Sequence, residues 1–386
     1  MRREAEAVMG VEPIRLVQFT RSFFIGGTEV QVLELLRGLP PSYQLQVSVL
    51  QEAGPLVGEL RKLGFTPEEF PLHGSLARPN TLWQVVRLAR WLEQNRIELV
   101  HVHDFYATML AVPAAKLAGA KVIVSRLDLA HWHGPARRAL LAQLTRMADH
   151  VVANAGAIRE MLVEEEEIDS SRVSVIHNGL DLPRFDARIR QGLQGPVPDT
   201  GGAPVVVHVA NMNHVVKRQE DLLEALALLR REGLKLHAFL VGDGPRRPGL
   251  ERKAAELGVA ELAHFLGHRG DVPALYAGAN LGVLCSTAEG MSNAVMEGMA
   301  AGLPMVVTAV GGNTDLIVDG LRGKEVQPER HAELAQAFRW LLEHPERAKD
   351  FGAAARGFVR RELSLERMVQ RHDALYQSVA RPAPAQ

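Results

Sequence analysis

Short apolar runs alternate with helical patterns along the whole chain, and this alternation restricts the fold more than any other feature. The expected strands are residues 14–19, 46–50, 99–103, 121–125, 150–153 and 173–177, and then 205–210, 236–241, 262–266, 281–285 and 304–309. Helical patterns of about 10–20 residues separate them, which is typical of parallel βαβ units. The sequence therefore predicts an α/β fold with parallel sheets.

One segment interrupts this alternation. Residues 192–204 are rich in glycine and proline and have no hydrophobic period, so we interpret them as a linker. The predicted domains are an N-terminal domain over residues 1–191 and a C-terminal domain over residues 203–360, both Rossmann-like and facing each other across a cleft. Ligands of such sheets bind beyond the carboxyl ends of the strands, so the cleft is the expected site.

Composition excludes several classes of protein. The 44 Lys and Arg residues nearly balance the 45 Asp and Glu residues, and this balance argues against a nucleic-acid partner. The single cysteine, Cys285, excludes an intrachain disulfide and an all-cysteine zinc site. No run of about 18 apolar residues and no secretory signal is present, so we expect a cytoplasmic protein.

Residues 281–304 carry the most informative pattern. A strand is expected to end near Cys285, and a helix capped by Ser292 or Asn293 is expected to end at Gly302. The amino end of such a helix presents unpaired amides and a positive dipole end, which favour phosphate binding.

Two glutamates belong to this pattern. Glu289 precedes the predicted helix together with Gly290, which allows a ligand to approach the backbone closely. Glu297 lies about one turn inside the helix, where it is either an exposed helix residue or a carboxylate with a partner. Its small and apolar neighbours favour a partner.

At this point the chain resembles a known family. Glu289, Glu297 and the following residues 298–308 are similar to the signature of the family 4 retaining glycosyltransferases, which have the GT-B fold. Further resemblances lie at residues 26–29, 99–104, 175–185, 240–245, 265–267 and 310–317. The resemblance therefore covers most of the chain, and the series of motifs in order is far more specific than the glutamate pair alone.

The resemblance implies a role for each matching residue. Glu289 would contact the donor sugar near the reacting carbon, Glu297 would hold the ribose hydroxyls, and Lys217 would neutralise the leaving diphosphate. The implied donor-binding set also contains Gly26, Gly27, Asn211, Arg218, Gly267, Gly290, Met291, Ser292 and Asn293.

Three positions depart from the family pattern, and the mildest departure is Asp315, where the family often has glutamate. Asn211 stands where the family usually has an arginine, for which Arg218 is the expected substitute. A leucine stands near the place of a cleft histidine, and Asp128, Arg126 and His131 are the alternatives for its role. Asp128 is the third catalytic candidate, beside Glu289 and Lys217.

The resemblance implies a retaining, metal-independent enzyme that moves a sugar from a UDP- or GDP-sugar to a hydroxyl acceptor in polysaccharide, lipopolysaccharide or glycolipid synthesis. The nucleotide diphosphate sugar is a co-substrate, and no other cofactor is expected. Its N-terminal domain would bind the acceptor, and a helix over about 364–380 would pack back on that domain. No Asp-x-Asp motif is present, and His131 and His133 lack further metal ligands nearby. The alternatives are a nucleotide-sugar epimerase and a catalytically silent sugar- or lipid-binding protein.

A local positive charge suggests one more partner. Residues 78–146 contain ten Lys and Arg but only four Asp and Glu. On the helix expected here, one face carries Leu82, Val85, Val86 and Ala89. Another face carries Trp83, Arg87 and Arg90. The helix is either an ordinary cover of the sheet or a peripheral contact with anionic lipid on the inner face of a membrane.

Overall fold

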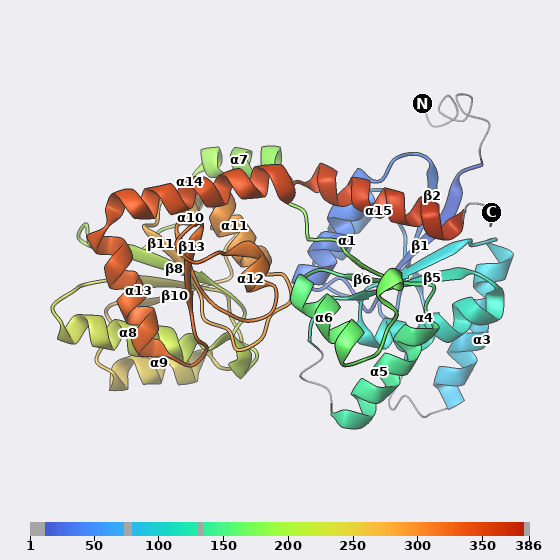
Figure 1. Ribbon diagram of the computed structural model, residues 1–386, viewed down its shortest axis with the longest axis horizontal. Helices are drawn as coiled ribbons and strands as arrows, with labels where there is room; N and C mark the ends of the chain where they lie inside the picture. The colour runs from blue at the N-terminus through green and yellow to red at the C-terminus, as the bar shows by residue number, and fades with distance from the viewer. Residues whose placement is uncertain (1–11, 73–78, 130–133, 382–386) are drawn as a thin grey trace. The chain divides into compact units, whose positions relative to one another are not determined.

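The chain folds into two compact units. The computed structural model describes residues 12–72, 79–129 and 134–381 (Figure 1). The first unit combines Met1–Gly179 with Leu365–Gln386, and the second unit is Leu180–Ser364. Within these described residues each unit has its own parallel sheet, with seven strands in the first and six in the second.

The division between the units falls earlier than the expected linker. It lies between Gly179 and Leu180, so residues 192–204 belong entirely to the second unit. Helix α7 (Leu182–Gln191) precedes this segment, and its Phe185 is buried in the core of the second unit. Burial of that aromatic ring explains why the glycine- and proline-rich segment does not separate the units.

The first unit has strand order β3-β2-β1-β4-β5-β6-β7, with every neighbouring pair parallel. Its strands are β1 Ile14–Thr20, β2 Tyr43–Val49, β3 Glu68–Glu69, β4 Leu99–Val102, β5 Lys121–Arg126, β6 His150–Ala153 and β7 Val173–Val175. Its helices are α1 Gly27–Gly38, α2 Val57–Lys62, α3 Pro79–Gln94, α4 Phe105–Ala118, α5 Pro135–Met147, α6 Gly156–Glu164 and α15 Leu365–Ala380.

Alternation along the strands builds two layers on this sheet. Val17 and Phe19 of β1 join a core cluster with α3, α4 and α5. Ile14 and Leu16 face the other way and pack with α1 and α15. Successive side chains of a strand point to opposite faces of the sheet. A sheet that is covered on both faces therefore needs apolar residues at both the odd and the even positions of its strands.

Only part of the expected face of helix α3 is covered, since Val85 and Ala89 are buried but Leu82 and Val86 are not. Val85 and Leu88 are buried against the sheet and α4, but 73% of Leu82 is exposed and Val86 is exposed as well. The buried residues of α3 recur every three or four positions, which places Leu82 and Val86 on the outer side of the helix. Both residues therefore lie on the exposed side of the helix, as Trp83 does.

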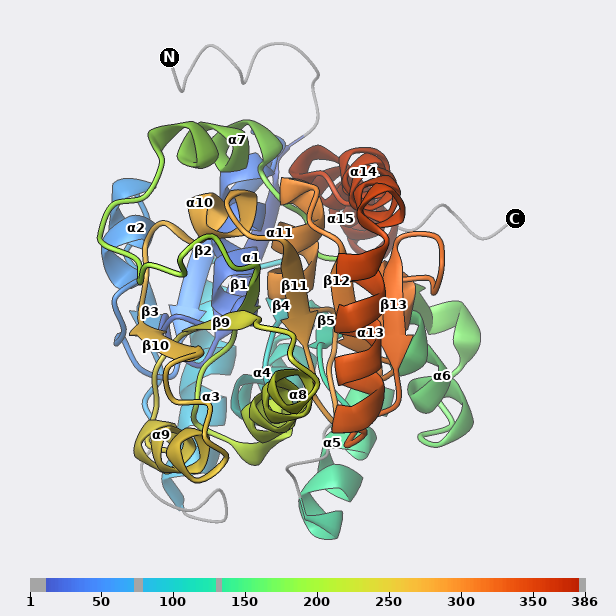
Figure 2. The same cartoon turned by 90° about the vertical axis from the view of Figure 1, so that its left-hand side faces the viewer.

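The second unit has strand order β10-β9-β8-β11-β12-β13, again with parallel neighbours (Figure 2). Its strands are β8 Val205–Val209, β9 His237–Val241, β10 Ala263–Gly267, β11 Leu281–Leu284, β12 Met305–Thr308 and β13 Gly323–Val326. Beside α7, its helices are α8 Gln219–Arg231, α9 Arg247–Glu256, α10 Val272–Ala277, α11 Asn293–Ala301, α12 Asn313–Leu316, α13 His331–Glu343 and α14 Pro345–Glu362.

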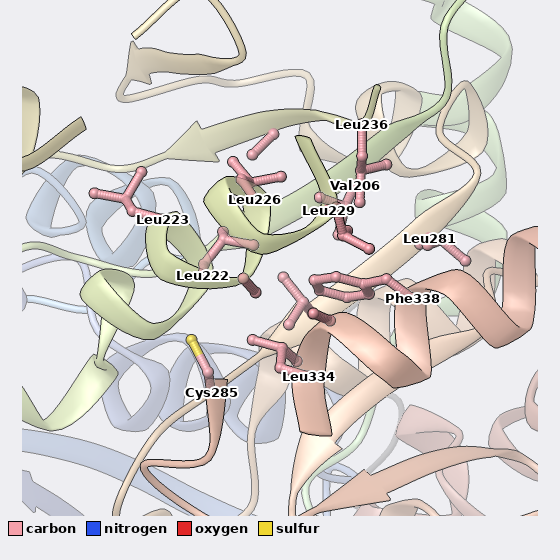
Figure 3. Packing of buried hydrophobic residues seen from close by; sticks show 14 of the residues in the cluster. Val206, Leu222, Leu223, Leu226, Leu229, Leu236, Leu281, Cys285, Leu334 and Phe338 are labelled. Carbon is pink, nitrogen blue, oxygen red and sulfur yellow. The ribbon is translucent and has the colours of Figure 1, made fainter. Parts of the chain in front are cut away.

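Helices α8 and α13 lie side by side on one face of this sheet and form its larger core (Figures 2 and 3). Leu222 and Leu226 of α8 and Phe338 of α13 meet strand residues such as Val206 there, all of them buried. Cys285 lies at the margin of the same cluster, which confirms the interpretation of its thiol as a core group. The carboxyl ends of β8 and β11 are thereby fixed to a rigid layer.

Among the described residues, no helix is both long enough and apolar enough to cross a membrane.

Candidate active site

Lys217 and Glu289 form an ion pair at the carboxyl end of the second sheet. Lys217 closes the 3-10 turn Val215–Lys217 after β8, and Glu289 lies in the loop after β11. Nζ of Lys217 lies 2.5 Å from Oε1 of Glu289, and only 21% and 10% of the two side chains are exposed. Oγ of Ser286 donates to the same oxygen at 2.5 Å. A cation and a carboxylate are thus held at the edge where open α/β sheets bind ligands.

The loop after β11 also forms hydrogen bonds to the backbone of the turn that carries Lys217. The thiol of Cys285 contacts the carbonyl oxygens of Lys217 and Arg218 at 3.5 and 3.1 Å, and the amide of Thr287 donates to the carbonyl of Val216 at 2.9 Å. Burial raises the pKa of the Cys285 thiol, which therefore stays protonated and donates. The sequence predicted a core thiol here but not this supporting contact.

The guanidinium of Arg218 is paired with neighbouring carboxylates. Its guanidinium bonds to Asp221 at 2.7 and 3.0 Å and lies 3.3 Å from Glu329, and the hydrogen bond to Asp221 raises its pKa. Asn211, which stands in the place of the family arginine, accepts a hydrogen bond from the amide of Asn213 at 3.2 Å. A substitute role for Arg218 would therefore require the guanidinium to leave Asp221.

A glycine in the next loop fixes the backbone at Glu289. Gly311 has a φ of +50°, and a Cβ at this position would overlap the carbonyl oxygen of Glu289. Oγ1 of Thr308 donates to the carbonyl of Ser286 at 2.5 Å, and the amide group of Asn313 donates to the carbonyl of Thr308 at 3.0 Å. The position of the Glu289 loop is therefore set by the loop after β12.

Helix α11 begins as the sequence predicts. The side chain of Ser292 accepts from the amide of Val295 at 3.4 Å, so Ser292 is the N-cap and Asn293 is the first helical residue. Gly302 ends the helix with a φ of +82°, in the left-handed conformation of a C-cap. The amino end of α11 thus follows directly on the loop that carries Glu289.

Glu297 is a partly buried carboxylate on α11, as its neighbours indicated. Burial raises its pKa to about 7, and the positive charge of Arg188 on α7 opposes this shift. The hydroxyl of Tyr276 donates to the carbonyl of Ala294 at 2.9 Å and packs α10 against α11. Arg188 has no signal in the sequence patterns, because only the fold brings α7 to this part of the second unit.

Gly267 closes β10 in the left-handed region, with a φ of +66°. Its carbonyl accepts from the amide of Gly242 at 2.8 Å, which ties the loops after β9 and β10 together. A Cβ at Gly242 would in turn overlap the carbonyl of Ala210. Glycines let three loops at the carboxyl edge approach one another by their backbones.

In the first unit, Gly26 is the N-cap of α1 and Gly27 is its first residue, without a side-chain cap. A Cβ at Gly26 would overlap the carboxylate of Glu29. Burial raises the pKa of Glu29 to about 6, and the negative charge of Asp104 acts in the same direction. Asp104 is itself occupied as the N-cap of α4, where it accepts from the amide of Ala107 at 2.9 Å.

The three alternatives for the cleft histidine have different environments. Arg126 is buried and bonds to both carboxylate oxygens of Glu166 at 2.6 and 2.8 Å, so its guanidinium serves a structural ion pair. Asp128 follows β5 and is partly buried. His131 lies outside the described residues.

Metal binding was considered for His131 and His133, and both lie outside the described residues. Within residues 12–72, 79–129 and 134–381, no group of three or more His, Cys, Asp or Glu side chains is placed to hold a metal ion.

Comparison with known proteins decides the family. A family model described as "Glycosyltransferase Family 4" matches residues 25–184, and one described as "Glycosyl transferases group 1" matches residues 203–344. The chain belongs to the family 4 glycosyltransferases.

This glycosyltransferase is similar in sequence to proteins with assigned names. It is 28% identical over 379 residues to D-inositol 3-phosphate glycosyltransferase 2 of Catenulispora acidiphila, covering 89% of this chain and 84% of the relative. It is 25% identical to N-acetyl-alpha-D-glucosaminyl L-malate synthase of Bacillus anthracis, covering 78% and 80%.

Solved structures show the same fold. HepE of Anabaena in complex with UDP superimposes with a TM-score of 0.82 at 22% identity, covering 95% of this chain and all of HepE. The lipopolysaccharide outer core galactosyltransferase WaaB superimposes with a TM-score of 0.75 at 16% identity, again covering 95% of this chain and all of WaaB. This glycosyltransferase therefore has the two-domain α/β fold of the GT-B class, as predicted.

The structure brings together part of the expected site of this glycosyltransferase. Residues of the second unit from the expected set are Lys217, Arg218, Asn211, Gly267, Glu289, Gly290, Met291, Ser292, Asn293 and Glu297. Those of the first unit are Gly26, Gly27 and Asp128. Ser286 and Gly311 were missed, although a serine three residues before Glu289 and a glycine pair after β12 were visible in the sequence.

Proposed function

We propose that this glycosyltransferase transfers a sugar from a UDP- or GDP-sugar to a hydroxyl acceptor, with retention of the anomeric configuration and without a metal. The observation that carries the proposal is the ion pair of Lys217 and Glu289 beside the amino end of α11. The structures of HepE with UDP and with UDP-glucose support a nucleotide-sugar donor by their common fold. The relatives' names support transfer to small hydroxyl compounds.

The chemistry explains why this pair suits the reaction. The bond between the anomeric carbon and the diphosphate oxygen breaks, and its electron pair stays on the diphosphate. The acceptor oxygen forms the new bond, and its proton passes to the diphosphate that leaves. Negative charge therefore grows on the leaving group, where the ammonium of Lys217 and the amides of α11 would stabilise it.

Glu289 has two roles in this proposal. Its carboxylate holds the Lys217 ammonium and accepts from Ser286, so the cation is oriented before the donor binds. Its second oxygen would be available to hydroxyls of the donor sugar. Glu297 would bind the ribose hydroxyls, and the first unit would bind the acceptor.

The test follows free nucleotide in the presence of UDP-glucose, GDP-mannose and related donors, with and without candidate acceptors such as inositol phosphate or malate. We expect acceptor-dependent release of the nucleoside diphosphate, and NMR of the product should show the anomeric configuration of the donor. Conversion of the donor without nucleotide release would indicate an epimerase instead. Donor binding without any turnover would indicate a silent binding protein.

Measuring transfer in the presence of a chelator tests whether the reaction is independent of metal ions. The transfer rate should stay unchanged after EDTA treatment, because Lys217 and the α11 amides neutralise the leaving group. A loss of transfer that added Mg²⁺ or Mn²⁺ restores would contradict this part of the proposal.

We also propose that the outer side of α3 contacts an anionic membrane surface, from which the acceptor would come. Leu82 and Trp83 are 73% and 60% exposed, and Val86 and Arg90 are exposed beside them. Apolar and aromatic side chains beside arginine suit the interface of an anionic bilayer. Arg87 does not contribute its full charge, because it pairs with Glu68 at 2.9 Å.

Flotation with phosphatidylglycerol vesicles tests this contact. Wild-type protein should float with the vesicles, and the Trp83→Asp variant should not. Leu321→Asp changes an exposed leucine of the second unit and serves as the control, which should float normally. Absence of wild-type protein from the vesicle fraction would contradict the proposal.

A further inference from the structure

A row of polar side chains lies buried on the sheet face that α15 covers. Gln18 on β1, His101 on β4 and Ser125 on β5 occupy neighbouring strands, and Gln18 pairs with His101 in the strand register. All three are buried. They point to the same face as the apolar residues that pack with α15, such as Leu16 and Ile123. Polar groups at such positions need partners, because water does not reach them.

Helix α15 supplies these partners. The hydroxyl of Tyr376 lies 2.6 Å from Nδ1 of His101 and accepts from the side-chain amide of Gln18 at 3.1 Å. Nε2 of His101 lies 2.8 Å from Oγ of Ser125. Directly after β4, Nε2 of His103 lies 2.6 Å from Oε1 of Gln18. One tyrosine of α15 therefore joins three strands in a single chain of hydrogen bonds.

The directions of these bonds fix the protons. The amide oxygen of Gln18 can only accept, so His103 carries its proton on Nε2. The Gln18 amide nitrogen donates to Tyr376, which leaves the tyrosine proton for Nδ1 of His101. His101 then donates from Nε2 to Ser125. His101 is therefore neutral in this arrangement, because a second proton on its Nδ1 would meet the hydroxyl proton of Tyr376.

A third histidine lies on α15 itself. The ring of His372 lies 5.7 Å from the rings of both His101 and Tyr376, and its Nδ1 donates to the carbonyl of Met368 at 3.0 Å. The rings of His101 and His103 are 4.1 Å apart. His101 thus lies beside both other buried imidazoles, so a proton on either neighbour disfavours a proton on His101.

We infer that Gln18, His101, His103, Ser125, His372 and Tyr376 form a proton-sensitive latch, which holds α15 on the first unit at neutral pH and loosens it when the histidines become protonated.

Burial is the main cause of the sensitivity. It lowers the pKa of His103 to about 3 and of His372 to about 4, and it lowers the pKa of His101 well below its usual value. Positive charge on the other histidines adds to the effect on His101. A released histidine with a pKa of about 6.5 binds a proton much more readily, so acid favours release.

Other titratable groups on the elements around the latch have partners of their own. They are Tyr43 on β2, Asp373 on α15, and Glu34 and Arg37 on α1. Tyr43 donates to Asp373 at 2.5 Å, and Arg37 pairs with Glu34 at 2.6 Å. Glu29 on α1, whose pKa burial raises to about 6, also titrates between pH 7.5 and 5, so histidine variants are needed to isolate the contribution of the latch.

Hydrogen exchange of the full chain at pH 7.5 and pH 5.0, corrected for the intrinsic rate, tests the latch. Protection of α15 should fall by about 30-fold for each histidine exposed on release, from a pKa near 6.5 when free and near 4 or below when buried. Peptides of α8 in the second unit are the internal reference. Unchanged protection of α15 at pH 5.0 would overturn the inference.

Two variants separate a latch from simple packing. His372→Gln cannot take up a proton and should lose about 30-fold less protection on acidification, whereas the exposed control His344→Gln should behave as the wild type. Tyr376→Phe removes two hydrogen bonds and should lower α15 protection already at pH 7.5. Equal acid responses of wild type and His372→Gln, or full α15 protection in Tyr376→Phe, would also refute the latch. If His372→Gln does not fold, NMR of ¹³C-labelled histidine in the wild type tests the latch instead. The latch imidazoles must then become protonated over the same pH range in which α15 loses its protection from exchange.

Discussion

Nζ of Lys217 and Oε1 of Glu289 lie 2.5 Å apart, although 72 residues separate them in the sequence. The pair joins the turn after β8 to the loop after β11, two strands that are neighbours in the sheet. Ser286 shares the same carboxylate oxygen, so the glutamate is oriented from two sides. This geometry places a fixed cation next to the amino end of α11, and it underlies the first prediction.

Lys217→Gln should lower kcat of sugar transfer by about 10²–10³-fold, because a preorganised charge that stabilises the leaving group is lost. Steady-state kinetics of nucleotide release measure the effect. Lys349→Gln, an exposed lysine on α14, is the matched control and should keep the wild-type rate. A Lys217→Gln enzyme with normal kcat would show that this ammonium does not act on the leaving group.

Gly311→Ala should be strongly destabilising and should lower activity. Its φ of +50° disfavours a side chain, and the new Cβ would overlap the carbonyl oxygen of Glu289. We expect a loss of more than about 2 kcal/mol in the free energy of unfolding, measured with urea. Gly320→Ala is the control: it has a φ of +71° but open space around the Cβ position, so it should cost only about 1 kcal/mol. If Gly311→Ala and Gly320→Ala lost the same free energy of unfolding, overlap with the carbonyl oxygen of Glu289 would be excluded as the cause.

The free energy of unfolding should depend on pH through Glu297. Its folded pKa of about 7 lies above the ordinary glutamate value of 4.5, so the folded chain holds this proton more tightly than the unfolded chain does. The stabilising contribution is complete below pH 4.5 and is lost as pH rises through about 7. Glu297→Gln should remove this decline in urea unfolding between pH 5 and pH 8, while the exposed Glu343→Gln should retain it. An identical pH profile for wild type and Glu297→Gln would contradict the raised pKa.

Glu166→Ala should destabilise the first unit by about 3–5 kcal/mol, because it leaves the guanidinium of Arg126 buried without its carboxylate. Only 3% of the Arg126 side chain and 15% of the Glu166 side chain are exposed. Its neighbour Glu165 lies 3.9 Å from Arg138 in an exposed pair, so Glu165→Ala should change stability by less than about 1 kcal/mol. Thermal unfolding of the two variants side by side measures the difference, and similar melting temperatures would argue against a buried ion pair.

Local patterns were sufficient for most of the fold. The alternation of apolar runs and helical patterns predicted the parallel sheets, and Ser292 and Gly302 were recognised as helix caps because capping depends on nearby residues. The division between the units lies earlier than the expected linker, and the expected covered face of α3 was right at Val85 and Ala89 but wrong at Leu82 and Val86. Phe185 and Leu82 show why: whether an apolar side chain is buried depends on what packs against it, which composition and period alone do not contain.

The sequence by itself determined the order of most elements, though not strands β3 and β13. It also determined the glycines at the strand ends and the spacing of Glu289 and Glu297, since these follow from local propensity and periodicity. Only the tertiary structure decided which groups meet: Ser286 and Lys217 at one carboxylate, Arg188 near Glu297, and Tyr376 over Gln18 and His101. The physical reason is that hydrogen bonds and charge interactions act over a few ångströms in space. Contacts between residues as far apart in the chain as Gln18 and Tyr376 exist only after the sheet and its covering helices have formed.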